Sequence, residues 1–296
     1  MRDRIGRRSL LLGMLGASFA PGNALVAAES TLAQRLADLE IEAGGRLGVC
    51  ALDTASGRSV GLREHERFAM CSTFKLLLAA AVLRRADMAQ LDLDRQITFG
   101  SSDMLSHAPV TSAKLAAGSM SIRQLCAAAV EMSDNPAANL LLAQIGGPAG
   151  LTRDLRNLGD AITRLDRIEL ALNTNVRGDE RDTTTPHAMA QTFGRILTGD
   201  ALGESSRQLL ITWLKASPTG ARRIRAGLPE NWVVGDKTGT GVNGAVNDVA
   251  VVWPPGRAPL ILAIYMSESS RPTAELESVH ARVAGLVAEA VTARQL

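Results

Sequence analysis

Apolar residues recur at helical spacing near the start of the chain and at strand spacing soon afterwards. Three leucines share one face of a predicted helix over 31–43, which Ser30 can cap. Two short runs, 46–53 and 58–63, flank a turn at 54–57 and predict a β-hairpin.

The run 72–88 is apolar on nearly every side, and a helix without a polar face belongs inside a protein. Further helices are predicted at 122–131, 135–145, 151–158 and 186–198. Strand character returns only at 232–240, 248–253 and 260–267, before a closing helix at 273–294.

Strands at both ends with helices between them indicate an α+β protein. We expect an antiparallel sheet built from both chain ends and flanked by terminal helices, with a large all-helical lobe inserted. The predicted boundaries are an α/β lobe of 29–66 with 216–296 and a helical lobe of 67–215. The cleft between the lobes is the expected active site.

The first residues read as an export signal. A basic start containing Arg7 and Arg8, an apolar run at 10–20 and small residues at 26–28 predict a signal peptide over 1–28. The paired arginines fit a twin-arginine signal, and an ordinary secretory signal remains the alternative. We therefore expect a periplasmic or secreted protein without a membrane span.

Loss of 1–28 removes four arginines and one aspartate and changes the formal net charge from +2 to −1. No basic stripe remains, so we expect no nucleic-acid partner. We also expect the protein to be a monomer. The histidines show no ligand spacing, so we predict no metal and no cofactor. The three cysteines are an odd number, so at least one is free or pairs with another chain.

Ser72-Thr-Phe-Lys75 places a hydroxyl and an amine on one face of the apolar helix. About one Ser-x-x-Lys is expected by chance in a chain of this length. The chain has 28 arginines and only four lysines, however, so a lysine inside this helix indicates that a titratable amine is needed. A buried structural lysine is the alternative.

Ser133-Asp134-Asn135 lies between two predicted helices. The serine can pass a proton to a leaving nitrogen, and the asparagine can hold a substrate amide. Loop and helix-capping chemistry explains the same residues equally well.

Lys237-Thr238-Gly239-Thr240 ends a predicted strand. A cation and hydroxyls along an edge can bind a carboxylate, and Gly239 lets substrate lie against the backbone. The Thr240 N–H can stabilise an oxyanion. A merely polar strand end is the alternative.

The segment 164–186 has many charges and few apolar anchors, which predicts an irregular loop held by ion pairs. Within it Glu169 and Asn173 can together hold a water molecule. A solvated loop is the alternative.

Taken in order, Ser-x-x-Lys, Ser-Asp-Asn and Lys-Thr-Gly are the motif set of class A β-lactamases and penicillin-binding proteins. The mature region resembles class A β-lactamases throughout, including 140–151, 178–186 and 233–240. The resemblance implies the roles of nucleophile for Ser72, proton donor for Ser133, and acylation base for either Lys75 or Glu169. It implies an oxyanion hole at the N–H groups of Ser72 and Thr240.

The remaining roles follow from the same resemblance. Asn135 would hold the substrate amide, Lys237 with Thr238 the substrate carboxylate, and Glu169 with Asn173 the hydrolytic water. The ion pair that closes the loop would join Arg167 and Asp182, and β-lactams would be the substrates.

The chain departs from the family at several positions. Ala245-Val246 stands where many members have a carboxylate-binding arginine, and Arg223 resembles the alternative supplier. Leu170 replaces a frequent proline after Glu169, and we predict that the peptide between them is cis. His107 takes the place of an aromatic residue at the cleft mouth, where it would act as a gatekeeper.

The cysteines also depart from the family. Cys71 resembles half of a disulfide of serine carbapenemases, but the partner position is Gly241. Cys126 resembles half of another, whose partner position is Ala79. We predict no disulfide.

Three other functions share the motif set. A penicillin-binding transpeptidase or carboxypeptidase and a β-lactam sensor are both acylated without rapid turnover. Glu169 and Asn173 argue against both functions, because they can activate the water that releases the acyl group, which those proteins lack. A non-catalytic relative is disfavoured because every catalytic position is filled.

Overall fold

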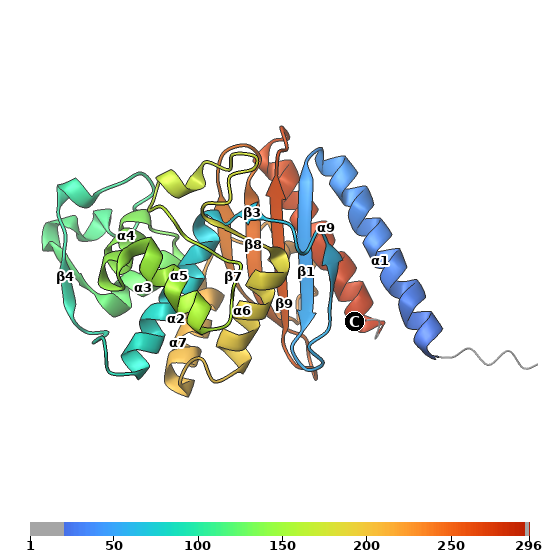
Figure 1. The fold of residues 1–296 in the computed structure, drawn as a ribbon, viewed down its shortest axis with the longest axis horizontal. Coiled ribbons are helices and arrows are strands. Elements are labelled where there is room, and N and C mark those ends of the chain that lie inside the picture. Colours follow the sequence, from blue (N-terminus) through green and yellow to red (C-terminus); the bar gives the residue numbers. More distant parts are fainter. Residues whose placement is uncertain (1–20, 294–295) are drawn as a thin grey trace, which may run out of the picture.

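The computed structural model describes residues 21–293 and 296, with side chains from residue 32 on. The first 20 residues of the predicted signal peptide lie outside this range. At the centre is an antiparallel sheet in the order β2-β1-β9-β8-β7 (Figure 1). Its strands are β1 (Arg46–Asp53), β2 (Ser59–Leu62), β7 (Val233–Thr240), β8 (Val246–Trp253) and β9 (Leu260–Ser267).

Both faces of this sheet are buried, and alternate residues of each strand serve different cores. On β1, Val49 and Ala51 face α1 (Pro21–Ala43) and α9 (Thr273–Thr292), whereas Cys50 faces the core of the helical part. Figure 1 shows α1 and α9 together on one side of the sheet and the other large helices beyond its opposite side.

Helix α2 (Phe74–Asp87) runs through the middle of the helical part, and its residues 74–83 are all buried. The prediction of a buried helix is confirmed. The helices around it are α3 (Ile122–Glu131), α4 (Asn135–Gln144), α5 (Gly147–Asn157), α6 (Pro186–Thr198), α7 (Glu204–Ala216) and α8 (Ile224–Gly227).

Short elements complete the fold. Two small antiparallel pairs join β3 (Phe68–Ala69) to β6 (Thr183–Thr184) and β4 (Gln96–Thr98) to β5 (Ser119–Ser121). The 3-10 turns are η1 (Cys71–Thr73), η2 (Ser101–Asp103), η3 (Ser112–Ala117) and η4 (Ala171–Asn173).

Three element predictions need correction. Helix α1 begins at Pro21, so Ser30 lies inside it and is not its cap. The residues of the helix that precede Ser30 include three alanines, a leucine and a glutamate, which all favour helix. Helix α5 begins at Gly147, where Pro148 suits a first turn. Helices α7 and α8 were not predicted: α7 buries apolar side chains only at Leu210, Trp213 and Leu214, and α8 is four residues long and buries only Ile224.

The predicted fold class is confirmed. The sheet combines strands from both ends of the chain, the terminal helices cover one of its faces, and the helical part is inserted between β2 and β7. In the part of the chain that the structure describes, every helix is too short or too polar to cross a membrane.

Candidate active site

The hydroxyl of Ser72 lies on η1, the 3-10 turn that leads into α2. Sequence reasoning placed it in the first turn of the α-helix itself. Strand β7 passes close beside this turn, since a Cβ on Gly239 would lie 2.8 Å from the Met70 carbonyl oxygen and 3.2 Å from the Ser72 nitrogen. Gly239 therefore allows the strand to approach the backbone of Ser72.

Lys75 and Glu169 are both buried next to Ser72. Their side chains form an ion pair of 2.9 Å between Nζ and Oε1, and both are fully shielded from solvent. The Ser72 hydroxyl donates to the same Oε1 over 3.3 Å. Burial lowers the pKa of Lys75, while the Glu169 charge opposes that shift. An amine with a lowered pKa can exchange its proton with its neighbours.

The Ser133-Asp134-Asn135 segment meets the same amine. Lys75 Nζ donates to the Ser133 carbonyl oxygen at 2.8 Å and to Asn135 Oδ1 at 2.5 Å. Asp134 caps α4 by accepting from the Ala137 N–H. The motif therefore combines the capping chemistry that was the alternative with side chains turned toward the site.

The loop after α5 brings Glu169 to the site. Asn173 on η4 donates to Glu169 Oε2 at 2.7 Å, and the backbone of Glu169 is held on both sides by the Asn139 amide at 3.0 Å. The Glu169–Leu170 peptide bond is cis, as predicted. Asn139 was not singled out in the sequence, where nothing distinguishes it from any helical asparagine.

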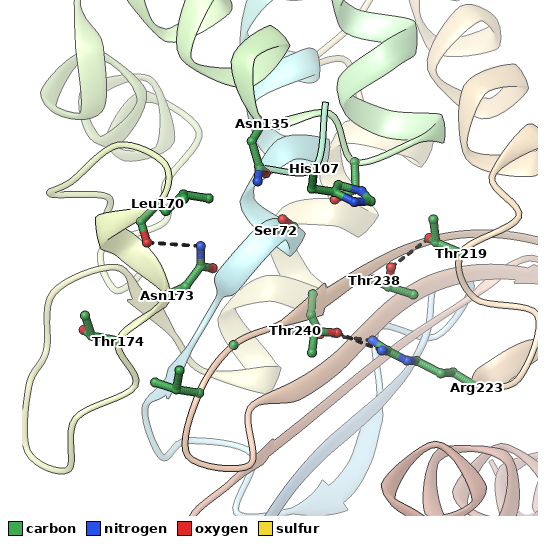
Figure 2. Close-up of a pocket in the computed structure, with 14 residues that line it drawn as sticks. Ser72, His107, Asn135, Leu170, Asn173, Thr174, Thr219, Arg223, Thr238 and Thr240 are labelled. Atoms are coloured by element: carbon green, nitrogen blue, oxygen red, sulfur yellow. Dashed lines mark hydrogen bonds between the residues drawn. The ribbon is translucent and has the colours of Figure 1, made fainter. Parts of the chain in front are cut away.

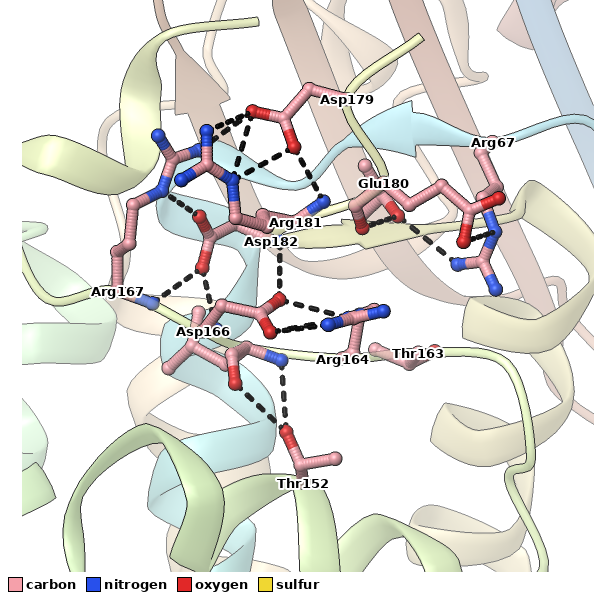
Figure 3. A network of polar contacts seen from close by, with 12 residues as sticks. Arg67, Thr152, Thr163, Arg164, Asp166, Arg167, Asp179, Glu180, Arg181 and Asp182 are labelled. Atoms are coloured by element: carbon pink, nitrogen blue, oxygen red, sulfur yellow. Dashed lines mark hydrogen bonds and ion pairs between the residues drawn. The ribbon is translucent and has the colours of Figure 1, made fainter.

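A network of charges closes this loop (Figure 3). Arg167 Nε lies 2.5 Å from Asp182 Oδ2, and the other oxygen of Asp182 accepts the N–H groups of Asp166 and Arg167. Asp179 lies 3.8 Å from Arg167 and binds Arg181 at 2.8 Å. Because the Asp182 side chain is fully buried, these donors are what keep its charge satisfied.

Strand β7 and Arg223 form a cationic side of the site. Arg223 is 4% exposed, donates to Thr240 Oγ1 at 2.8 Å and pairs with Glu277 at 3.3 Å. Lys237 is fully buried and donates to the Thr238 carbonyl oxygen at 2.8 Å. Burial and the nearby charge of Lys75 lower the pKa of Lys237 to about 7.

These groups surround a cavity of about 600 Å³ (Figure 2). Figure 2 shows His107 and Asn135 on one side, Leu170 and Asn173 on another, and the β7 threonines with Arg223 on a third. The lining residues are Ser72, His107, Ser133, Asn135, Leu170, Asn173, Thr174, Thr219, Arg223, Thr238, Gly239, Thr240, Gly241 and Val242.

Lys75, Glu169 and Lys237 are buried and are not among these lining residues. Arg167 and Asp182 do not line the cavity either, and pair with each other within the loop (Figure 3). Thr219 was missed by sequence reasoning; its hydroxyl accepts from Thr238 at 2.7 Å. His107 is exposed at the rim, with Nε2 2.9 Å from the Met132 carbonyl oxygen. All three cysteines are buried and free.

The Ser72 hydroxyl is hydrogen-bonded to Glu169, which pairs with the buried Lys75, and an open cavity lies beside them along β7. This arrangement is typical of serine enzymes that transfer acyl groups. A model of the family described as "Beta-lactamase enzyme family" matches residues 31–291. The chain belongs to the β-lactamase enzyme family.

Named relatives place it among the class A members. It is 46% identical to β-lactamase CTX-M-8 of Citrobacter amalonaticus, over 98% of this chain and 99% of that one. It is also 46% identical to the carbapenem-hydrolyzing β-lactamase KPC of Klebsiella oxytoca, over 96% of each chain. The solved class A β-lactamase of the last common ancestor of Gram-negative bacteria (GNCA4) has a TM-score of 0.87 and 55% identity, covering 88% of this chain and 99% of that one.

Proposed function

We propose that this protein is a serine β-lactamase that opens the β-lactam amide bond through an acyl-enzyme and thereby confers antibiotic resistance. The observation that carries the proposal is the convergence of the Ser72 hydroxyl and the Lys75 amine on one oxygen of Glu169, at 3.3 and 2.9 Å. Nucleophile, base and orienting group are then within reach of one another before substrate arrives.

In the acylation step, Ser72 Oγ attacks the lactam carbonyl carbon, and the N–H groups of Ser72 and Thr240 stabilise the developing oxyanion. The serine proton passes to Glu169 or Lys75. The hydroxyl contact at 3.3 Å supports Glu169 as its acceptor in the free enzyme. Ser133 then donates a proton to the ring nitrogen as the amide bond breaks, and the proton that left Ser72 passes from the base to Ser133. This leaves an ester on Ser72, with the base and Ser133 in their starting protonation states.

The substrate carboxylate binds at the β7 side of the cavity. Arg223, Thr238 and Thr240 line that side. The Thr240 hydroxyl accepts from Arg223 and can donate its own hydrogen to the carboxylate, while Arg223 adds positive charge behind it. Asn135 holds the substrate's side-chain amide. Lys237 does not itself line the cavity, and in its protonated form it adds a nearby positive charge. His107 at the rim is the proposed gatekeeper.

Hydrolysis of the ester needs a water molecule held by Glu169 and Asn173. The contact of 2.7 Å between their side chains supports this role. Glu169 removes a proton from the water as the water oxygen attacks the ester carbon. That proton then passes to the Ser72 oxygen, which leaves as the alcohol, and Glu169 is again a carboxylate. This step separates a β-lactamase from a transpeptidase or a sensor, which keep the acyl group.

The variant Glu169→Ala tests this step. We expect hydrolysis of a chromogenic cephalosporin to fall by about 10²–10⁴-fold, the usual worth of a general base, and a stable adduct to appear on the protein. Mass spectrometry after a short incubation measures the adduct. The acylation rate of the same variant distinguishes Lys75 from Glu169 as the first base.

Glu180→Ala is the matched control, since Glu180 is an exposed carboxylate of the same loop. It should turn over substrate at the wild-type rate. Wild-type protein that accumulates a long-lived adduct without releasing product would instead identify a penicillin-binding protein or a sensor, and would contradict the proposal.

We further propose that the protein acts as a monomer in the periplasm or outside the cell after removal of 1–28, and binds no nucleic acid. The formal charge of −1 for the remaining chain supports the last point. The lobe boundaries, 29–66 with 216–296 and 67–215, are part of the same proposal. The site cavity between β7 and the helical part supports them.

A further inference from the structure

Away from the active site, three side chains with different metal-binding atoms meet on the face of β1 that α6 covers. Cys50 comes from the middle of β1, Glu64 follows β2, and His187 lies in the first turn of α6. One ligand atom from each lies within 4.8 Å of the other two. Sequence spacing predicted no metal site, because these residues are far apart along the chain.

We propose that Cys50, Glu64 and His187 form a zinc-binding site that joins the β1–β2 hairpin to α6. A thiolate, a carboxylate and an imidazole are the donor types that Zn²⁺ takes. The bivalent ion and the two negative ligands together carry no net charge, which suits a largely buried position.

The imidazole of His187 has an unused buried nitrogen. Its Nδ1 is hidden from solvent and has no hydrogen-bond partner, although buried polar atoms nearly always find one. The same atom lies 3.7 Å from Glu64 Oε2. Ligands of a tetrahedral zinc ion are about 3.3–3.8 Å apart, given bonds of about 2.0–2.3 Å. This pair is therefore already at coordinating distance.

The thiol of Cys50 is fully buried, and Glu64 stands beside it. Burial and this carboxylate raise the thiol pKa, so without metal the group keeps its proton. Binding replaces the S–H bond with a zinc–sulfur bond and releases one proton to solvent. The ion supplies the positive charge that the thiolate otherwise lacks.

Neighbouring groups already fix the carboxylate and the histidine. The Ser59 hydroxyl donates to Glu64 Oε2 at 3.2 Å, and the His187 backbone N–H donates to the Glu64 carbonyl oxygen at 2.9 Å. Such surrounding hydrogen bonds orient the ligands of metal sites. The side chains of Glu64 and His187 are 27% and 33% exposed, which leaves an entry path and room for a water as fourth ligand.

The first test is metal binding to the full protein after treatment with a chelator. We expect the wild type to bind one Zn²⁺ ion per chain and to release a proton. Cobalt(II) in its place should give the near-ultraviolet charge-transfer band of a thiolate–cobalt bond. The melting temperature should rise with zinc concentration, because the ion binds only the folded chain. No cobalt–thiolate band in the wild type would overturn the proposal.

Variants identify the ligands. Cys50→Ser and His187→Gln should each lower zinc affinity by more than about 100-fold, and Ser59→Ala by about 10–100-fold. Cys126→Ser and His65→Gln are the matched controls. Cys126 is a buried thiol elsewhere, and His65 is an exposed histidine whose ring centroid lies 4.7 Å from that of His187, with the two rings tilted by 54°. They should bind zinc as the wild type does.

Cephalosporin turnover should be unchanged in all five variants in the presence of chelator, which shows that they are folded. If Cys50→Ser does not fold, Ser59→Ala still tests the site, because it removes only a hydrogen bond to the Glu64 carboxylate. Wild-type affinity in Ser59→Ala and His187→Gln would overturn the assignment.

Discussion

Lys75 is a charged residue in a fully buried position, where lysine is seldom found. Its amine is fully buried and meets Glu169, the Ser133 carbonyl oxygen and Asn135 within 2.9 Å. Three close contacts leave room for a compact ammonium group and not for a planar guanidinium. This explains why an arginine-rich chain has a lysine here.

We expect Lys75→Arg to lower kcat/KM for a chromogenic cephalosporin by at least about 10²-fold, because arginine cannot take part in proton transfer. Steady-state kinetics at neutral pH measures the loss. Lys215→Arg changes a lysine that lies over the Trp253 ring, remote from the cavity, and should keep wild-type kinetics. Equal activity of Lys75→Arg and wild type would show that the titration of this amine is not needed.

At the scale of elements, the loop that carries Glu169 has little apolar anchoring and depends on charge. Asp182 is fully buried and lies against Arg167, whereas Arg181 at 55% exposure pairs with Asp179 near the surface. Loss of the interior pair should therefore lower the free energy of unfolding more than loss of the surface pair does.

Arg167→Gln should destabilise the fold by about 3 kcal/mol, because it leaves the buried Asp182 carboxylate without its charged partner. It should also slow deacylation by displacing Glu169. Urea denaturation and the rate of adduct loss measure the two effects. Arg181→Gln is the control, with an expected cost of about 0–1 kcal/mol. Similar losses for the two variants would refute the role assigned to the interior pair.

The elements themselves were largely predictable. β1, α3, α6 and β9 have the predicted bounds, because their apolar residues repeat with the period of a strand or a helix. α7 escaped prediction because only Leu210, Trp213 and Leu214 anchor its buried face. Local periodicity predicts an element reliably where its apolar face runs along the whole element, and unreliably where that face is only a few residues long.

At the scale of the whole molecule, His280 joins α9 to the sheet. It is fully buried, and its Nε2 lies 3.0 Å from the Val246 carbonyl oxygen of β8. Burial, with the charge of Arg223, lowers the pKa of His280 to about 3, from 6.5. The unfolded chain therefore takes up a proton at this residue before the folded chain does, and the free energy of unfolding falls as the pH drops from about 6.5 towards 3.

We expect His280→Gln to reduce this pH dependence by about 1.4 kcal/mol per pH unit between about pH 6 and pH 4, the contribution of one proton. Urea denaturation at several pH values measures the slope. His65→Gln, at an exposed histidine, should leave the slope unchanged. An identical slope in His280→Gln and wild type would mean that His280 is not the residue responsible.

The sequence by itself determined the fold class and the family and indicated Ser72 as the candidate nucleophile, since these depend on local periodicity and on motifs of a few adjacent residues. Only the tertiary structure decided which distant groups meet. Ser72 and Glu169 are 97 positions apart, yet share a hydrogen bond. The hydrogen bond between Arg223 and Thr240 likewise could not be predicted from the spacing of residues along the chain.

The same limit explains why sequence spacing did not indicate the proposed metal site. Cys50, Glu64 and His187 come together because α6 covers the face of the sheet to which Cys50 points. A period of two along β1 indicates that Cys50 is buried, but not what it is buried against. Which side chains converge depends on how helices pack on the sheet, and packing is a property of the whole chain.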